Sequence, residues 1–153
     1  MLSLVDRIMS EASFLELAEK QCFVDLSDQK CKISSFLSER QGRLAIITSG
    51  GTAVPIEKKT VRVIDNFSTG LRGARLAEFF IENQYTVLFL YRTGSKFPYV
   101  HRLSRDPMDL LRGGSNCEYT CPKAIFDETK FLAIPFTQVF EYILLLRHAL
   151  MQS

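Results

Sequence analysis

The run Val87-Leu88-Phe89-Leu90 is apolar at every position. A strand with one face in solvent alternates apolar and polar residues, whereas a strand covered on both faces reads as a continuous apolar run. Residues 86–91 therefore predict a strand in the middle of a layered α/β fold, and not one at the edge of an open antiparallel sheet.

Two further apolar runs and one helical pattern surround this strand. Leu44-Ala45-Ile46-Ile47 predicts one strand, and a second is expected from Val61 to Ile64. Residues from about 70 to 83 repeat apolar side chains at helical spacing. Buried strands that alternate with a helix favour parallel pairing. We predict a Rossmann-like α/β fold, with a parallel sheet of about three strands and flanking helices.

The remaining segments divide the chain into two predicted parts. Residues 1–40 carry apolar residues at helical spacing and predict a helical arm that packs against a nucleotide-binding α/β domain of residues 41–153. A last helix is expected from about Thr137, the candidate N-cap, to Met151. Glycines and prolines predict a loop over residues 106–123. A sheet of about three strands leaves apolar surface uncovered, so we expect the domain to be truncated.

Composition excludes several classes of protein. The chain has 153 residues, 46% of them apolar, which suits one compact domain. The formal charge is +2 and basic residues are scattered among acids, so nothing favours nucleic acid as a partner. No apolar stretch approaches the roughly 20 residues of a membrane span. Several charged residues are scattered through the first 20 positions, where a signal peptide would have an apolar stretch. We expect a cytoplasmic protein without a membrane partner.

The cysteines and histidines do not have the spacing of a metal site. No Cys-x-x-Cys pair occurs, and the only imidazoles are those of His101 and His148. His148 lies in a predicted helix, far along the chain from either cysteine pair, Cys22 with Cys31 or Cys117 with Cys121. We interpret the thiols as reduced and structural, and expect no metal bound by protein ligands.

Two glycine-containing turns are candidates for binding an anion. The first, Thr48-Ser49-Gly50-Gly51-Thr52, directly follows a predicted strand. The second, Asp65-Asn66-Phe67-Ser68-Thr69-Gly70-Leu71-Arg72-Gly73, follows another strand and opens the predicted helix. Unpaired N–H groups and the positive end of a helix dipole favour a phosphate at such a turn. Two turns of this kind suggest one nucleotide site.

The residues of these turns have more than one interpretation. Gly50 could let the main chain approach a ligand closely or could form a plain turn, and both readings fit. Asn66 could donate its amide to a carboxylate or phosphoryl oxygen, although composition alone favours an ordinary turn residue. Gly70 and Gly73 lack the first glycine of Gly-x-Gly-x-x-Gly, which disfavours a nicotinamide-dependent reductase with Asp65 as a ribose ligand without excluding it.

Taken together, the motifs of residues 43–103 closely resemble the eukaryotic phosphopantothenate–cysteine ligases. The segment 132–137 and the helix after it resemble the family more loosely. The similarity is carried by Thr48-Ser49-Gly50-Gly51-Thr52, Pro55-Ile56-Glu57, Val61-Arg62-Val63-Ile64-Asp65-Asn66-Phe67-Ser68-Thr69-Gly70-x-x-Gly73, Leu88-Phe89-Leu90-Tyr91-Arg92 and Phe97-Pro98-Tyr99-x-His101-Arg102.

In that family the carboxylate of 4'-phosphopantothenate attacks the α-phosphate of a nucleoside triphosphate, and the amine of cysteine then displaces the nucleotide, as a step of coenzyme A synthesis. The resemblance implies that 4'-phosphopantothenate and cysteine are substrates, with ATP as the nucleotide and Mg²⁺ beside its phosphates. It assigns Asn66 to phosphopantothenate and to stabilisation of the acyl-nucleotide. It assigns the nucleotide to Gly50, Ser68, Gly70 and Gly73.

The resemblance is to the N-terminal part of the family only. Family members continue into further strands that complete the substrate pocket and much of a homodimer contact. Two hypotheses follow: a ligase, or a shortened, non-catalytic isoform that binds nucleotide or a partner.

Overall fold

The computed structural model describes residues 11–57, 62–102 and 127–153. Its centre is a parallel sheet of β1 (Leu44–Ser49), β4 (Thr86–Arg92) and β5 (Phe131–Phe136), in the order β1-β4-β5. In the register of this sheet, Phe89 lies between Ile47 and Ala133. Residues 87–90 are fully buried, which confirms that this apolar run forms the middle strand of a layered α/β fold.

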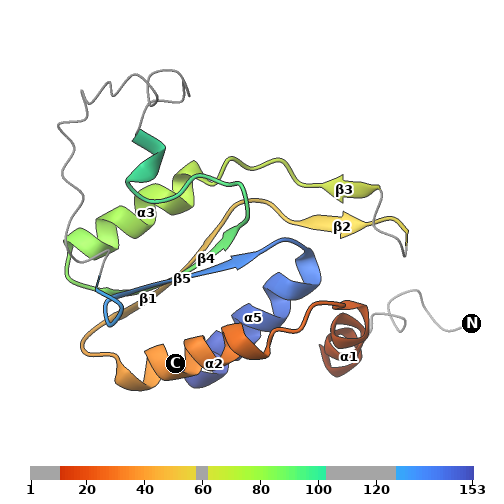
Figure 1. Cartoon of the computed structure of the whole chain (residues 1–153), viewed down its shortest axis with the longest axis horizontal. Coiled ribbons are helices and arrows are strands. Elements are labelled where there is room, and N and C mark those ends of the chain that lie inside the picture. The colour runs from red at the N-terminus through yellow and green to blue at the C-terminus, as the bar shows by residue number, and fades with distance from the viewer. Residues whose placement is uncertain (1–10, 58–61, 103–126) are drawn as a thin grey trace, which may run out of the picture.

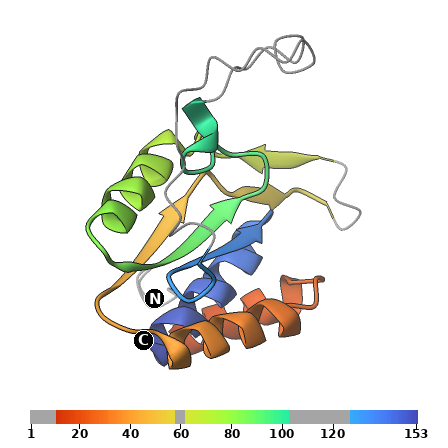
Figure 2. The ribbon, with the colours of Figure 1, turned by 60° about the vertical axis from the view of Figure 1, so that its left-hand side comes forward.

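Helices cover the two faces of this sheet, as Figures 1 and 2 show. Helix α3 (Leu71–Glu82) packs on one face, and α1 (Glu11–Gln21), α2 (Ser27–Glu39) and α5 (Val139–Gln152) lie on the other. Because side chains alternate along a strand, Val87 and Phe89 join the hydrophobic cluster under α3, while Leu88 and Leu90 join the cluster with α2 and α5.

The described part of the predicted N-terminal arm, residues 11–40, packs against the rest of the described chain, as expected. Ile33, Phe36 and Leu37 of α2 are buried in the same cluster as Ile134 of β5 and Leu145 of α5. Burying a side chain of this size contributes about 1.5–3 kcal/mol, so the arm's apolar stripe adds substantially to the core. None of the helices within the described residues is long and apolar enough to cross a lipid bilayer.

The second predicted strand is wrong in its partner and its exposure. Residues 63–65 form β3 (Val63–Asp65), which pairs antiparallel with β2 (Ala53–Pro55) in a separate two-stranded sheet. Ile64 is 66% exposed, and Figure 1 shows this hairpin extending away from the parallel sheet. The third strand of that sheet is β5 instead. A short segment rich in β-branched residues, such as 61–64, predicts extended backbone but does not say which strand it pairs with.

The helix boundaries agree closely with the sequence, apart from one cap. Helix α3 matches the expected 70–83, whereas α5 begins at Val139 with Gln138, and not Thr137, as its N-cap. The backbone N–H of Thr137 donates to Oε2 of Glu141 at 2.9 Å. The carboxylate of Glu141 therefore takes up the N–H before the helix, and no hydroxyl cap is made. The loop predicted over 106–123 lies outside the described residues.

Candidate functional site

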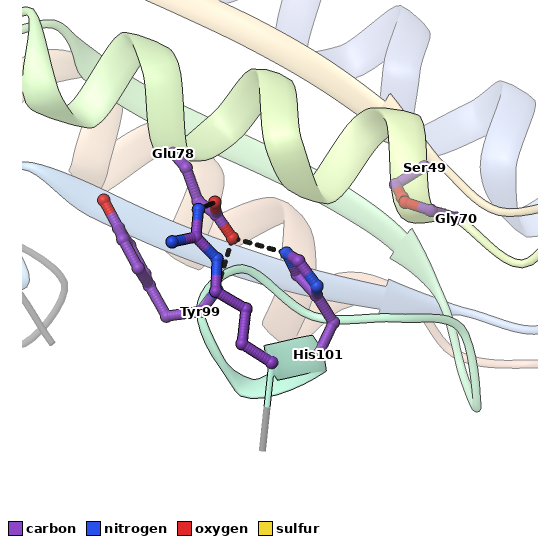
Figure 3. Close-up of polar contacts among 6 residues, drawn as sticks. Ser49, Gly70, Glu78, Tyr99 and His101 are labelled. Atoms are coloured by element: carbon purple, nitrogen blue, oxygen red, sulfur yellow. Dashed lines mark hydrogen bonds and ion pairs between the residues drawn. The ribbon is translucent and has the colours of Figure 1, made fainter. Parts of the chain in front are cut away.

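The two glycine turns meet at the carboxyl end of β1. The hydroxyl of Ser49 donates to the carbonyl oxygen of Gly70 at 3.0 Å, a contact seen in Figure 3. The backbone N–H of Asn66 donates to the carbonyl oxygen of Thr52 at 3.0 Å. The two turns are therefore in direct contact, while a nucleotide site shared between them stays a prediction. We call residues 48–52 and 66–73 together the cradle.

Close packing inside the cradle accounts for its glycines. A Cβ on Gly51 would lie 1.6 Å from the carbonyl oxygen of Asn66, and one on Gly73 would lie 2.5 Å from Oγ of Ser49. Gly70, with φ of 75°, also adopts the left-handed backbone that other residues disfavour. The chain's own contacts therefore require these glycines, so the case for a ligand depends on the cavity and the N–H groups around them.

A cavity of about 240 Å³ opens between the turns and α5. One side is formed by the first turn together with Asn66, and the other side is aromatic. Its lining residues are Thr48, Ser49, Gly50, Thr52, Asn66, Phe136 and Tyr142. Of the predicted site residues, Gly50 and Asn66 line this cavity. Phe136 and Tyr142 were missed, because they come from distant segments.

The other three predicted residues lie at the start of α3 and do not line the cavity. Gly70 and Gly73 are buried beneath Ser49, while Ser68 is exposed. Gly70 is the N-cap of α3 and no side chain caps the helix. The nearby N–H of Gly70 reaches Oγ of Ser68 only at 3.4 Å, and the first turn carries no acidic residue. The N–H of Leu71 likewise reaches Oγ1 of Thr69 only at 3.5 Å. No acidic side chain of this turn therefore offsets the positive end of the helix dipole.

Asp65, immediately before Asn66, is held by Arg92 at the end of β4. The guanidinium donates from Nη1 to Oδ1 at 2.5 Å and from Nη2 to Oδ2 at 2.6 Å. The hydrogen bonds from Arg92 lower the pKa of Asp65, and those to Asp65 raise the pKa of Arg92. Both oxygens of Asp65, the residue considered above as a ribose ligand, are thus engaged in an ion pair with Arg92.

Arg92 was not recognised from the sequence. Its position offered a signal, because the carboxyl ends of neighbouring parallel strands meet at one edge of the sheet. Ser95 was missed as well. Its side chain packs against both turns, because a Cβ added to Gly50 or to Gly70 would lie 3.1 Å from Oγ of Ser95. The N–H of Lys96 donates to the carbonyl oxygen of Thr69 at 2.8 Å. The loop after β4 is thus a third wall of the cradle.

A buried carboxylate ties the continuation of this loop to α3. Oε1 of Glu78 accepts from the backbone N–H of Tyr99 and from Nε2 of His101, each at 2.7 Å, and Oε2 accepts from Arg102. Figure 3 shows these side chains on the face of α3 that lies over the loop, further along the helix from Ser49 and Gly70. His101, considered above as a possible metal ligand, is thus a partner of Glu78.

The same charged residues border a second cavity, of about 650 Å³, which also reaches Arg75, Glu82 and Lys96. It is larger than the cavity of the cradle, but Glu78 and Arg102 at its base pair with each other. We therefore assign it no ligand. In the part of the chain that the structure describes, no cluster of three or more histidine, cysteine or acidic residues could hold a metal ion. Cys22 and Cys31 are free thiols.

Comparison with curated proteins gives a consistent set of relatives. The chain is 42% identical over 124 residues to phosphopantothenate–cysteine ligase 2 of Oryza sativa subsp. japonica, covering 69% of this chain and 38% of that protein. It is 35% identical over 150 residues to the ligase CAB2 of Saccharomyces cerevisiae, with 87% and 41% covered. It is also 35% identical over 156 residues to ligase 1 of Arabidopsis thaliana, with 89% and 49% covered. No protein-family model matches the chain.

Solved structures support the same relationship. A mutant of Cab2 in complex with phosphopantothenate-cysteine superposes with a TM-score of 0.58 and 31% identity, covering 94% of this chain and 49% of that one. A second structure of the mutant gives a TM-score of 0.59 at 31% identity, covering 92% and 48%. The chain thus spans at most about half the length of these relatives.

Proposed function

The chain is related by sequence and by fold to part of the phosphopantothenate–cysteine ligases, and we propose that it supplies the nucleotide- and phosphopantothenate-binding part of such a ligase. The observation that carries the proposal is the cradle. It places Asn66 and Gly50 around one cavity, beside the uncapped start of α3. Phosphate groups are the ligands that such an arrangement favours.

The cradle residues then have distinct roles. The N–H groups around Gly50, Gly70 and Gly73, with the hydroxyl of Ser68, bind phosphates of ATP. Asn66 contacts 4'-phosphopantothenate, whose carboxylate attacks the α-phosphate to give an acyl-adenylate and pyrophosphate. The amide of Asn66 donates to the oxygen on which negative charge develops when the cysteine amine attacks. The cavity of about 240 Å³ is smaller than the roughly 300–1,000 Å³ of ligand pockets, so it holds only part of these substrates.

The groups around the cradle also indicate how a magnesium ion would be bound. Both carboxylate oxygens of Asp65 accept hydrogen bonds from Arg92. The residues that line the cavity include no carboxylate. Mg²⁺ commonly keeps several waters and is bound chiefly through substrate phosphates. The residues present therefore fit an ion carried in by ATP, whose role is to neutralise triphosphate charge, with the N–H groups and the helix dipole offsetting the rest.

A second candidate function is binding without ligation. It is favoured by the cavity of about 240 Å³, which is too small to hold all the substrates of the ligation. The two candidates differ in one product. Given ATP, magnesium, 4'-phosphopantothenate and cysteine, the ligase releases pyrophosphate, whereas the binding protein takes up ATP with no release.

A tryptophan reporter can test binding independently of activity. The chain contains no tryptophan, and Phe67, between Asn66 and Ser68, is 97% exposed. Phe67→Trp is expected to give fluorescence that saturates with ATP and magnesium or with 4'-phosphopantothenate. Phe23→Trp, at a 74% exposed position outside the cradle, is the matched control and is expected to respond to neither. Equal signals from both variants, or none from either, would contradict a ligand site at the cradle.

Self-association is proposed for the hairpin of β2 and β3. Apolar side chains exposed on or beside it are Val54, Ile56, Val63 and Ile64. An exposed apolar patch of this kind marks a contact surface, and a second copy of the chain is the occupant that the family resemblance implies. A cytoplasmic location remains a prediction from the sequence.

A further inference from the structure

We infer that Asp65 and Arg92 are a positioning pair that orients Asn66 in the cradle. This inference rests on the proposed function, because it concerns the residue assigned to phosphopantothenate. It adds two residues to the site that neither the motifs nor the relatives' names assign.

The pair joins residues of two different sheets. Asp65 is the last residue of β3, in the antiparallel hairpin, and Arg92 is the last residue of β4, at the centre of the parallel sheet. Residue 66 begins the turn directly after this cross-link. The position of Asn66 relative to the cavity therefore depends on where Arg92 holds Asp65.

Arg92 also lies directly beneath the first turn. A Cβ on Gly50 would sit 2.7 Å from Cβ of Arg92. The stem of Arg92 thus contacts one turn while its guanidinium binds the residue before the other. Because both contacts belong to a single side chain, Arg92 links the first turn to the residue that precedes Asn66.

The main chain of Asn66 is restrained from the opposite side. Its N–H donates to Thr52 at 3.0 Å, and its carbonyl oxygen packs so closely on Gly51 that no Cβ fits there. The Asn66 side chain itself is exposed. The N–H and the carbonyl oxygen of Asn66 therefore both contact the first turn, and the Asp65–Arg92 pair fixes the residue immediately before Asn66.

The geometry of the pair suits orientation better than a single charge contact would. Two parallel N–H···O bonds fix the relative tilt of guanidinium and carboxylate, which one ammonium cannot do. The two side chains are 21% and 27% exposed, so solvent competes only in part. The exposed pair Lys32–Asp28 on α2, with side chains 58% and 74% exposed, offers a matched control.

A double-mutant cycle on the whole chain tests the inference. Asp65→Asn, Arg92→Gln and the double variant are compared with wild type, and Asp28→Asn, Lys32→Gln and their double variant serve as controls. Calorimetry with 4'-phosphopantothenate gives the dissociation constant, and NMR gives the hydrogen exchange rate of the Asn66 amide. Both are measured where denaturation curves show every variant fully folded.

Each single variant of the pair is expected to weaken phosphopantothenate binding by about tenfold, with no further loss in the double variant, because the two residues act as one unit. Exchange of the Asn66 amide is expected to accelerate, and the control cycle to change affinity by less than about twofold. Additive losses in the pair, or unchanged exchange at Asn66, would overturn the inference.

Arg92→Lys covers the case in which the other variants do not fold, since it keeps the charge but not the two parallel bonds. It is expected to bind phosphopantothenate about threefold more weakly than wild type, and equal affinity would overturn the inference. If wild type binds neither phosphopantothenate nor ATP with magnesium, the proposed function fails. The exchange rate of Asn66 in the variants then decides the positioning role by itself.

Discussion

Ser49 and Gly73 lie so close that a single methyl group on the glycine would overlap the serine, with separations of 2.5 Å to both Cβ and Oγ and 3.0 Å to Cα. The same serine donates to the carbonyl oxygen of Gly70 at 3.0 Å. At the carboxyl end of β1, the side chain of Ser49 is therefore packed directly against the main chain of the first turn of α3. This contact is the physical basis of the cradle.

Gly73→Ala is expected to destabilise the fold by about 1–3 kcal/mol, because the added methyl forces β1 and α3 apart in a packed region. Urea denaturation measures the change. Ser49→Gly in the same chain removes two of the three overlapping atoms and is expected to restore part of the loss. Gly94→Ala is the control: Gly94 has φ of 86° but no atom within 4 Å of an added Cβ, so it reports backbone strain alone. A Gly73→Ala variant as stable as wild type would contradict the close contact.

Glu78→Gln is expected to cost about 2–4 kcal/mol, because it leaves buried donors facing an amide in place of a carboxylate. Glu78 is 3% exposed and accepts from Tyr99, His101 and Arg102. Glu82→Gln, an exposed position on the same helix, is expected to change stability by less than about 0.5 kcal/mol. Chemical denaturation measures the free energy of unfolding of both variants. Equal losses would show that Glu78 does not anchor the loop.

The Asp65–Arg92 pair is expected to weaken in acid. Hydrogen bonds from Arg92 hold the pKa of Asp65 below the ordinary value of an aspartate, so the carboxyl group is more acidic in the folded than in the unfolded protein. Its contribution to stability is present above the unfolded pKa and is lost as the pH falls through the folded one. Titration of the Asp65 side-chain carbon by NMR should give a midpoint below 3.8, and a higher midpoint in Arg92→Gln. The same midpoint in both proteins would exclude the pair.

Asn66→Asp tests the catalytic role in a protein that completes the ligase reaction. A carboxylate repels the negative charge that develops when the cysteine amine attacks, and we expect this second step to be slowed more than formation of the acyl-adenylate. Pyrophosphate is therefore expected to be released in a first turnover while formation of the cysteine adduct slows. Rapid-quench measurements separate the two steps. Unchanged turnover would remove Asn66 from the site.

Ile64→Asp is expected to reduce self-association by the β2–β3 hairpin, because a charge in an apolar contact is costly to desolvate. Light scattering across a range of concentrations measures the mass of each species. Val100→Asp introduces the same charge at another exposed apolar position, 53% exposed against 66% for Ile64, and is expected to leave association unchanged. A wild-type protein that stays monomeric at all concentrations would rule out this contact.

Some elements could be predicted well because their signals are local. Helix α3 repeats its apolar residues at helical spacing, and its observed bounds fall within about one residue of the prediction. The strand that contains Val87 and Phe89 was recognised because both of its faces are buried, so every position is apolar. The buried stripe of α2, with Ile33 and Phe36, was read in the same way.

Other elements could not be predicted because they depend on contacts between distant residues. Val63 and Ile64 are as apolar as a core strand, yet they pair with Val54 and Pro55 in an exposed hairpin. β5 was not foreseen as the third strand, although Ile134 is buried beside Leu90. Periodicity reports which faces are covered, but not which strand does the covering.

The sequence alone determined the alternation of buried strand and helix, the position of the central strand and the two glycine turns, because each follows from side-chain spacing or backbone freedom within a few residues. Only the tertiary structure decided that Ser49 contacts Gly73 and that Arg92 binds Asp65. The same holds for Phe136 and Tyr142, which line the cavity. These contacts join segments 24 or more residues apart in the chain, and a long-range contact forms only when the whole chain packs.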